Sequence, residues 1–380
     1  MVDVNNMMNA MDFEALAAIG LGPAMRTQLA CGVADPNARL MRLVEVQRAQ
    51  WLLHDGCNSH SADCTAALVH DLRAQGESLT VGDWLLACPG GALGWRISCR
   101  LLPHSQITRR VKDGRCRDDR PGGLRQALVS NVDTALLVMG LDADFNLRRL
   151  ERYFALVHLA GVAAVLVLSK ADTLDAARCA QRVEQARSVL PAEVAVLALD
   201  LRAAQAALDL APWLAEGQTL ALLGSSGAGK STLANTLMAA FAGSGQRATG
   251  PARADDSRGR HTTSARTLLP LPGAACLIDT PGLRSLRLDV DAESDLGRVF
   301  GEVAQWAPYC RFRNCRHQAE PGCAVRQALP EPRLRNFQKL QREAGHDGLG
   351  VSQRQALRAQ WKLRSRHAAL RLQTKRESGG

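Results

Sequence analysis

The sequence feature that most restricts the fold is a glycine-rich loop ending in Lys-Ser, which runs Gly224-Ser225-Ser226-Gly227-Ala228-Gly229-Lys230-Ser231. An apolar run over 220–223 precedes it, and residues 233–240 follow without Pro or Gly, so the loop is expected between a buried strand and a helix. There the glycines let backbone N–H groups surround phosphate oxygens. Lys230 is predicted to reach the terminal phosphates, and the Ser231 hydroxyl to bind Mg²⁺. The predicted phosphate-binding residues are Gly224, Ser225, Ser226, Gly227, Ala228, Gly229, Lys230, Ser231 and Thr232.

A second motif, Asp279-Thr280-Pro281-Gly282, follows the apolar run over 275–278. An aspartate at the end of such a strand is placed to hold Mg²⁺ through water, and Gly282 is placed to offer its N–H to a γ-phosphate. Between the two motifs lies a polar loop that contains His261, Thr262 and Thr263. Such loops close over Mg²⁺ and the γ-phosphate, so one of the two threonines is expected to ligate Mg²⁺, and the choice between them stays open.

The preference for a base is indicated upstream, where an apolar run ends in Ser169-Lys170-Ala171-Asp172, a near match to the Asn-Lys-x-Asp guanine motif. The Asp172 carboxylate is expected to accept hydrogen bonds from guanine N1 and from the exocyclic amine, two donors that adenine lacks. The stem of Lys170 is expected to lie along the base. Ser169 replaces the usual Asn and so lacks a side-chain amide. The predicted nucleotide is therefore GTP, with weaker base contacts than usual.

The order of these motifs is itself informative. The guanine motif at 169–172 precedes the phosphate loop at 224–231, whereas in ordinary GTPases it follows. Apolar strand candidates alternate with helical segments from about 127 to 290, which is typical of a mostly parallel sheet with flanking helices. A circularly permuted P-loop GTPase domain is therefore predicted, because domain termini usually lie at the surface, where they can be rejoined.

Four candidate metal ligands follow within residues 310–323: Cys310, Cys315, His317 and Cys323. Three thiolates and one imidazole form a closed tetrahedral Zn²⁺ set with no open position, which indicates one structural zinc. The alternative is a group of reduced cysteines with a coincidental histidine. Arginines stand between the ligands, as expected of a small module that presents cations to RNA.

Together these motifs resemble one family closely, the circularly permuted GTPases called RsgA or YjeQ, which depend on the small ribosomal subunit. Weaker similarities at Val81-Gly82-Asp83, Asn131-Val132-Asp133 and 149–153 extend the resemblance over about residues 40–345. The resemblance implies a GTP hydrolase that acts late in maturation of the small (30S) subunit, binds its rRNA and is stimulated by that subunit. It also implies an N-terminal OB-type β-barrel, a permuted GTPase domain and a C-terminal helical zinc domain.

The expected layout has five parts: an N-terminal extension at 1–39, an OB-fold RNA-binding domain at 40–111, a GTPase domain at 124–290, a zinc-binding domain at 291–346 and a basic helical tail at 347–380. Within the barrel segment, short apolar stretches separated by turn residues indicate strands. The expected strands cover 43–46, 65–69, 84–87 and 95–97.

The charge balance fits an RNA partner. The chain has 380 residues and a formal net charge of +10, and clustered Lys and Arg gain affinity for nucleic acid by releasing counterions. A solvated basic surface is the alternative. The first residues lack the features of a secretion signal, and no apolar run approaches the length of a membrane span. A cytoplasmic monomer without a membrane partner is expected.

Two departures from common GTPase patterns affect the predicted site. Leu283 follows the Asp279–Gly282 motif, where many GTPases have a glutamine that orients the attacking water. His261 is the nearest candidate for that function, and contact with RNA is an equal alternative. Spacing also aligns Asp200-Leu201 with the family's Ser-Ala near the guanine oxygen, which leaves only a backbone N–H for that contact.

Two functions other than a GTPase are alternatives for this sequence. An RNA-binding assembly module with a weakly active or purine-tolerant nucleotide site remains the alternative, although Lys230, Ser231 and Asp279 are all present. A metabolic P-loop kinase would need a pocket and a base for an acceptor substrate, and the sequence indicates neither. It would also leave the Cys/His cluster unexplained.

Overall fold

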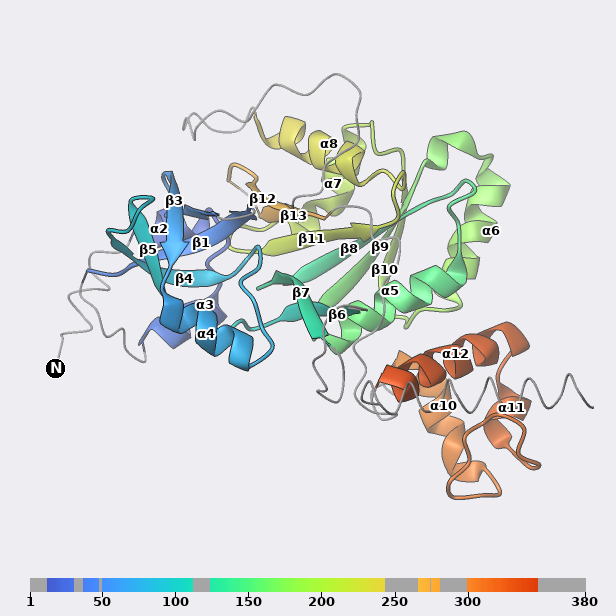
Figure 1. Cartoon of the computed structure of the whole chain (residues 1–380). Coiled ribbons are helices and arrows are strands. Elements are labelled where there is room, and N and C mark those ends of the chain that lie inside the picture. Colours follow the sequence, from blue (N-terminus) through green and yellow to red (C-terminus); the bar gives the residue numbers. More distant parts are fainter. Residues whose placement is uncertain are drawn as a thin grey trace, which may run out of the picture. The chain divides into compact units, whose positions relative to one another are not determined.

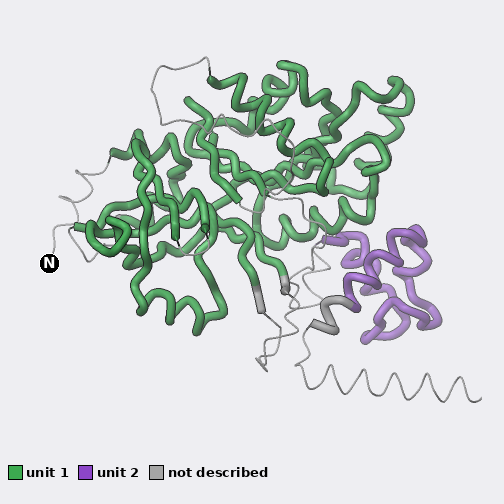
Figure 2. The backbone as a smooth tube through the Cα atoms, turned by 45° about the horizontal axis from the view of Figure 1, so that its top comes forward, with its two compact units in different colours: residues 1–109, 126–286 green, residues 110–125, 287–380 purple. Residues whose placement is uncertain are grey.

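The computed structural model describes residues 12–30, 37–47, 50–111, 124–242, 266–273, 275–280 and 299–347. The chain divides into two compact units, shown in green and purple in Figure 2. The first comprises residues 1–109 and 126–286, and the second comprises residues 110–125 and 287–380. No helix among the described residues is both long and apolar enough to cross a membrane.

Five strands at the start of the first unit close into a barrel (Figure 1). They are β1 (Arg39–Val46), β2 (Trp51–His54), β3 (Ser59–Cys64), β4 (Trp84–Pro89) and β5 (Trp95–Arg100). The ladder runs β1–β2–β3–β5–β4 and returns to β1, with only β3 and β5 parallel. Alternate side chains point inward, so Met41, Leu43 and Ile97 are fully buried in the barrel core. The predicted barrel is confirmed.

One predicted barrel strand is wrong. Residues 65–69 were expected to be extended, but the structure has helix α4 (Ala66–Ala74) between β3 and β4. Thr65 is its N-cap, and the Thr65 hydroxyl accepts a hydrogen bond from the N–H of Leu68 at 3.4 Å. Leu72 is buried, and Leu68 packs against the barrel core one helical turn away, so helical rather than alternating spacing buries this segment.

The second part of the first unit is a mostly parallel sheet. Its strands are β8 (Thr134–Gly140), β9 (Ala163–Ser169), β10 (Ala195–Leu199), β11 (Thr219–Gly224), β12 (Thr267–Pro270) and β13 (Cys276–Asp279). The spatial order is β10-β9-β8-β11-β13-β12, and only β12 runs antiparallel to its neighbour. Although β11 lies between β8 and β13 in the sheet, β8, β9 and β10 all precede β11 in the sequence. Such a sheet requires apolar strands, and every residue of β8 and β11 is buried.

Helices cover both faces of this sheet, with α5 and α6 on one side and α7 and α8 on the other in Figure 1. Their bounds are α5 (Leu147–Leu159), α6 (Ala176–Arg187), α7 (Gln205–Leu210) and α8 (Lys230–Ala242), with short 3-10 turns η1 (Ala171–Thr173) and η2 (Ala211–Trp213). Asn146 caps α5 by accepting from the N–H of Arg149 at 3.1 Å, and Asp175 caps α6.

The barrel and the parallel sheet are joined by strand pairing and by the predicted Val81-Gly82-Asp83 and Asn131 motifs. Strand β1 pairs with β12 at Glu45 and Thr267. The Asn131 amide donates to the carbonyl of Gly82 at 2.9 Å, and the Ser130 hydroxyl donates to the buried Asp83 carboxylate at 2.5 Å. A Cβ on Gly82, whose φ is +96°, would lie 2.1 Å from the carbonyl oxygen of Ser130. Only glycine fits this junction.

The N-terminal segment completes the same junction. Helices α2 (Phe13–Ala17) and α3 (Pro23–Ala30) bury Ile19, Leu21 and other apolar side chains. The fully buried Arg42 donates to the carbonyls of Ile19 at 2.5 Å and Asn131 at 3.0 Å. Burial lowers the pKa of Arg42, as expected of a cation held mainly by backbone carbonyls. Strands β6 (Gln106–Val111) and β7 (Leu124–Ser130) form a separate two-stranded sheet, and the basic linker expected at 112–123 lies outside the described residues.

Within the second unit, the described residues 299–347 are helical. They include α10 (Gly301–Trp306), the 3-10 turn η3 (Ala307–Tyr309), α11 (Ala324–Ala328) and α12 (Glu331–Asp347). Phe300 and Phe337 pack edge to face with ring centroids 5.3 Å apart, and Arg333 lies over the Phe300 ring. Nearly all of the expected basic tail, residues 348–380, lies outside the described residues.

Candidate functional site

The glycine-rich loop joins strand β11 to helix α8, as predicted. Gly227 and Gly229 have φ values of +82° and +101°, a conformation that side chains with a Cβ rarely adopt. Gly224 pairs with Val138 of β8, and a Cβ at Gly224 would lie 2.3 Å from the Val138 carbonyl oxygen. The loop therefore depends on glycine both for its turns and for its close approach to the neighbouring strand.

Lys230, the first residue of α8, directs its ammonium back over the loop. Its Nζ donates to the carbonyls of Ser225 at 2.7 Å and Gly224 at 3.1 Å. Burial lowers the pKa of Lys230, while the Asp279 and Asp144 carboxylates oppose that shift. Among the described residues, the hydrogen-bond partners of this buried ammonium are the two carbonyls, so it is suited to receive an anionic group, because a phosphate would compensate its charge. The Ser226, Ser231 and Thr232 side chains remain exposed around the same helix N-terminus.

Asp279 lies on the adjacent strand at the same end of the sheet. It ends β13 and pairs in register with Leu222 of β11, two residues before Gly224. Burial raises the pKa of Asp279, and the charge of Lys230 opposes the rise. The Thr280 hydroxyl donates to the Leu222 carbonyl and so fixes the end of β13. The structure thus brings a carboxylate and an ammonium together beside the glycine-rich loop.

Five residues discussed above for the γ-phosphate side lie outside the described residues. They are His261, Thr262, Thr263, Gly282 and Leu283. Their expected functions stay predictions.

The guanine motif meets the glycine-rich loop at one hydrogen bond. Ser169 ends β9, is 1% exposed, and donates from its hydroxyl to the carbonyl of Ala228 at 2.6 Å. Lys170 follows in the left-handed conformation with φ +61°, and its Nζ lies 2.7 Å from Asp142 Oδ2. Asp172 lies in the turn η1. The hydrogen bond from Lys170 lowers the pKa of the Asp142 carboxyl.

The loop expected near the guanine oxygen also lies beside Asp172. Strands β9 and β10 are parallel neighbours with Ser169 opposite Leu199, so Asp172 and Asp200 follow adjacent strand ends. Arg202 joins them, with its Nη2 at 2.7 Å from Asp172 Oδ2 and its Nε at 3.3 Å from Asp200 Oδ1. Leu201 turns inward and is 4% exposed.

Sequence reasoning missed two carboxylates at the carboxyl end of β8. Asp144 accepts from the Ser225 hydroxyl at 2.6 Å and from the N–H of Gly140 at 3.1 Å, and Arg149 donates to it as well. Asp142 pairs with Lys170 as described above. Their position in the sequence could have indicated both residues. Ligands of open α/β sheets bind at the carboxyl ends of the strands, and Asp142 and Asp144 follow the end of β8.

The four predicted metal ligands lie together in the second unit, with their ligand atoms within 4.8 Å of one another. Sγ of Cys310 lies 3.9 Å from Sγ of Cys323, and these two sulfurs lie 3.6 and 3.5 Å from Nδ1 of His317. Tetrahedral zinc with ordinary bond lengths requires S···S and S···N separations of about 3.8 and 3.5 Å. These three separations fit zinc, and the ligand atom of Cys315 lies within 4.8 Å of the other three.

Nearby backbone contacts hold this cluster in shape. His317 has φ +58°, and its carbonyl accepts from the Gln338 amide at 2.5 Å. The Glu320 carboxylate accepts from the N–H groups of Arg316, Gln318 and Ala319 at 3.0, 2.8 and 3.0 Å. The Glu320 side chain thus organises the loop between His317 and Cys323. The three cysteines of the cluster are free thiols.

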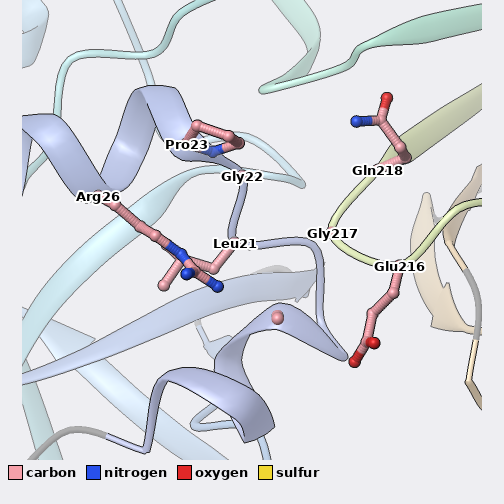
Figure 3. Close-up of a pocket in the computed structure, with 8 residues that line it drawn as sticks. Leu21, Gly22, Pro23, Arg26, Glu216, Gly217 and Gln218 are labelled. Atoms are coloured by element: carbon pink, nitrogen blue, oxygen red, sulfur yellow. The ribbon is translucent and has the colours of Figure 1, made fainter.

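A pocket of about 300 Å³ lies elsewhere in the first unit, between the N-terminal segment and the loop that precedes β11 (Figure 3). It is lined by Ala17, Leu21, Gly22, Pro23, Arg26, Glu216, Gly217 and Gln218. Glu216 to Gln218 precede the amino end of β11, while the glycine-rich loop follows its carboxyl end. Because ligands of such sheets bind at the carboxyl ends, this pocket is not the nucleotide site.

Comparisons with known proteins agree with this geometry. The family model described as "RsgA GTPase" matches residues 108–289. A protein of Xylella fastidiosa (strain M23) named "Small ribosomal subunit biogenesis GTPase RsgA" is 45% identical over 288 residues, which cover 74% of this chain and 79% of the relative. A Lactiplantibacillus plantarum protein named "Small ribosomal subunit biogenesis GTPase RsgA 2" is 35% identical over 337 residues, covering 87% of this chain and 90% of the relative.

Two solved structures share the fold. YjeQ from Thermotoga maritima superposes with a TM-score of 0.55 at 19% identity, covering 81% of this chain and 98% of that one. YloQ, described as a circularly permuted GTPase, gives 0.53 at 20% identity, covering 81% and 95%. The strand order seen here, in which β8 to β10 precede β11 in the sequence, is therefore that of a circularly permuted GTPase.

Proposed function

This chain belongs to the RsgA GTPase family, and we propose that it hydrolyses GTP during late maturation of the small ribosomal subunit. The observation that carries the proposal is the bond from Ser169 to Ala228, which puts the guanine motif against the phosphate loop. A single bound nucleotide could then meet Asp172 with its base and Lys230 with its phosphates.

In the proposed nucleotide complex, the Asp172 carboxylate accepts from guanine, and Lys170 lies along the base. The N–H groups of the glycine-rich loop surround the phosphates, and Lys230 exchanges its carbonyl partners for phosphate oxygens. Ser231 and Asp279 would hold Mg²⁺, directly and through water, and one of Thr262 and Thr263 would complete its ligands. Mg²⁺ neutralises charge on the β- and γ-phosphates when it is bound.

The attacking water needs an orienting group other than residue 283. A leucine side chain has no hydrogen-bonding atom, so Leu283 cannot supply that group. We assign the function to His261, whose imidazole can accept a proton from water near neutral pH. Gly282 would donate its N–H to the γ-phosphate.

The remaining domains are proposed to bind rRNA. We assign the closed five-stranded barrel, which has a helix between β3 and β4, to the OB type, whose members include binders of single-stranded nucleic acid. In the second unit, Cys310, Cys315, His317 and Cys323 would hold one structural zinc, and arginines between these ligands would face phosphates. The basic tail at 347–380 would add further phosphate contacts.

Co-sedimentation with purified small ribosomal subunits tests this proposal. The chain should pellet with small subunits in a non-hydrolysable GTP analogue, pellet less in GDP, and stay in the supernatant with large subunits. Lys230→Ala should lose the difference between the two nucleotides because its phosphate contacts are gone. Equal pelleting with both subunits in every nucleotide state would contradict a function on the small subunit.

A further inference from the structure

Arg202 is the cationic centre of a three-residue cluster at the proposed guanine site. Its Nη2 lies 2.7 Å from Asp172 Oδ2, and its Nε lies 3.3 Å from Asp200 Oδ1. The N–H of Arg202 also donates to Asp200 Oδ1 at 3.0 Å, so the arginine is held at its backbone as well as at its side chain. One guanidinium thus contacts both carboxylates at the ends of strands β9 and β10.

The cluster contains two neighbouring carboxylates and one cation. The resemblance described above places a serine at position 200, and a serine hydroxyl could donate a hydrogen bond to the carboxylate that accepts the base. Asp200 has no proton to donate at neutral pH, and two neighbouring carboxylates repel each other. The pKa of Asp200 lies below its ordinary value, first because the backbone N–H of Arg202 donates to it and also because the guanidinium does. Asp200 therefore stays charged, and Arg202 is the group that balances it.

We propose that Arg202 is a positioning residue for guanine, which orients the Asp172 carboxylate and cancels the repulsion from Asp200. The inference rests on the proposed assignment of Asp172 to the base. It identifies a residue, outside the guanine motif itself, on which the preference for guanine over adenine depends.

The geometry leaves room for the base. A carboxylate has about four lone-pair positions, so Asp172 can accept from Arg202 and still receive two hydrogen bonds from guanine. Only its Oδ2 is engaged by the arginine, and the Asp172 side chain is 31% exposed. Adenine has no donor at the matching positions, so loss of carboxylate orientation weakens guanine binding and leaves adenine binding unchanged.

Four variants and two nucleotides test the proposal on the full chain. Dissociation constants for GDP and ADP are measured by fluorescence titration for the wild type, Arg202→Ala, Asp200→Ser and the double variant Asp200→Ser with Arg202→Ala. Asp172→Ala is the fourth variant and tests the base assignment. A thermal melt of each variant verifies that it is folded.

Arg202→Ala should bind GDP roughly two- to fivefold more weakly, the scale of an ion pair whose arginine side chain is 71% exposed, and should bind ADP as the wild type does. Asp200→Ser should bind GDP as the wild type does. The double variant should recover most of the lost GDP affinity, because the repelling carboxylate is gone and a hydroxyl donor replaces the guanidinium. A change that only loosened the fold would weaken both nucleotides and would not be rescued.

Three results would overturn the inference. GDP binding by Arg202→Ala that equals or exceeds the wild type would mean that the ion pair is incidental or competes with the base. A double variant as weak as Arg202→Ala would mean that the arginine contacts the nucleotide itself. If either result is obtained and Asp172→Ala still loses the preference for GDP, the assignment of Asp172 to the base stands. A wild type without that preference would overturn both proposals.

Discussion

The Ser169 hydroxyl donates a 2.6 Å hydrogen bond to the carbonyl of Ala228, a residue 59 positions later in the chain. The bond connects the end of β9 to the glycine-rich loop, and both groups are buried. Permutation places the guanine motif before the phosphate loop in the chain, but the sheet brings the two ends together through β8 and β11. This contact therefore links the guanine motif to the phosphate loop. Removing it tests whether the two form one nucleotide site.

Removing this hydroxyl should weaken both folding and nucleotide binding. Ser169→Ala leaves the Ala228 carbonyl buried without its donor, which should cost about 1–2 kcal/mol of unfolding free energy and lower GDP affinity severalfold. Ser188→Ala is the matched control, because the Ser188 hydroxyl makes a similar 2.9 Å bond to the Gln185 carbonyl on an exposed helix end. Denaturant unfolding and GDP titration compare the two. Equal effects from both substitutions would contradict the importance of the buried bond.

Gly82 should be the most sensitive glycine of the domain junction. Gly82→Ala adds a Cβ that would lie 2.1 Å from the Ser130 carbonyl oxygen, at a φ of +96°. We expect a loss of more than about 3 kcal/mol, because backbone at the junction has to move. Gly90, with φ +127° and open space around its Cβ position, is the control for backbone strain alone and should lose about 1 kcal/mol on substitution by Ala. Chemical denaturation of both variants measures the difference.

The Cys/His cluster should hold one zinc ion per chain. Cys315→Ser should lose the metal and lower the thermal stability of the second unit, because metal binding to such sites is coupled to folding. Cys57→Ser, at an exposed cysteine of the barrel, should retain a full complement of zinc. Elemental analysis of the purified variants decides the matter. Full zinc in Cys315→Ser, or none in the wild type, would contradict the assignment.

Among the described cysteines of the first unit, Cys276 should be the least reactive. It is fully buried in β13, and burial raises its pKa to about 11, so the thiolate is scarce at pH 8. Iodoacetamide at that pH should modify the exposed Cys57 and Cys99 in the native protein, and modify Cys276 only after unfolding. Peptide mass spectrometry reads out each site. Rapid native labelling of Cys276 would show that β13 opens readily.

Much of this architecture could be predicted from local sequence signals. The segments 220–223 and 233–240 were expected to be a buried strand and a helix, and they lie in β11 and α8. The loop at 224–231 and the cluster at 310–323 were predictable because motif residues there are close in sequence. The segment 65–69 failed because a short apolar run suits either a strand or a helix, and the capping by Thr65 was not recognised.

Contacts between distant segments could not be predicted in this way. Nothing near Arg202 in the sequence indicates that it will reach Asp172, since the pairing of β9 with β10 creates that contact. Arg42 is a similar case, because its carbonyl partners, Ile19 and Asn131, come from separate parts of the chain. Such partners depend on the tertiary fold, and no single-sequence pattern encodes them.

The rate of GTP hydrolysis, measured with and without purified small ribosomal subunits, tests the central claim most directly. We predict slow hydrolysis by the free protein, stimulation of about tenfold or more by small subunits, and none by large subunits. Lys230→Ala should abolish the stimulated rate, because its ammonium lies over the glycine-rich loop. The same rate with and without small subunits would contradict the account.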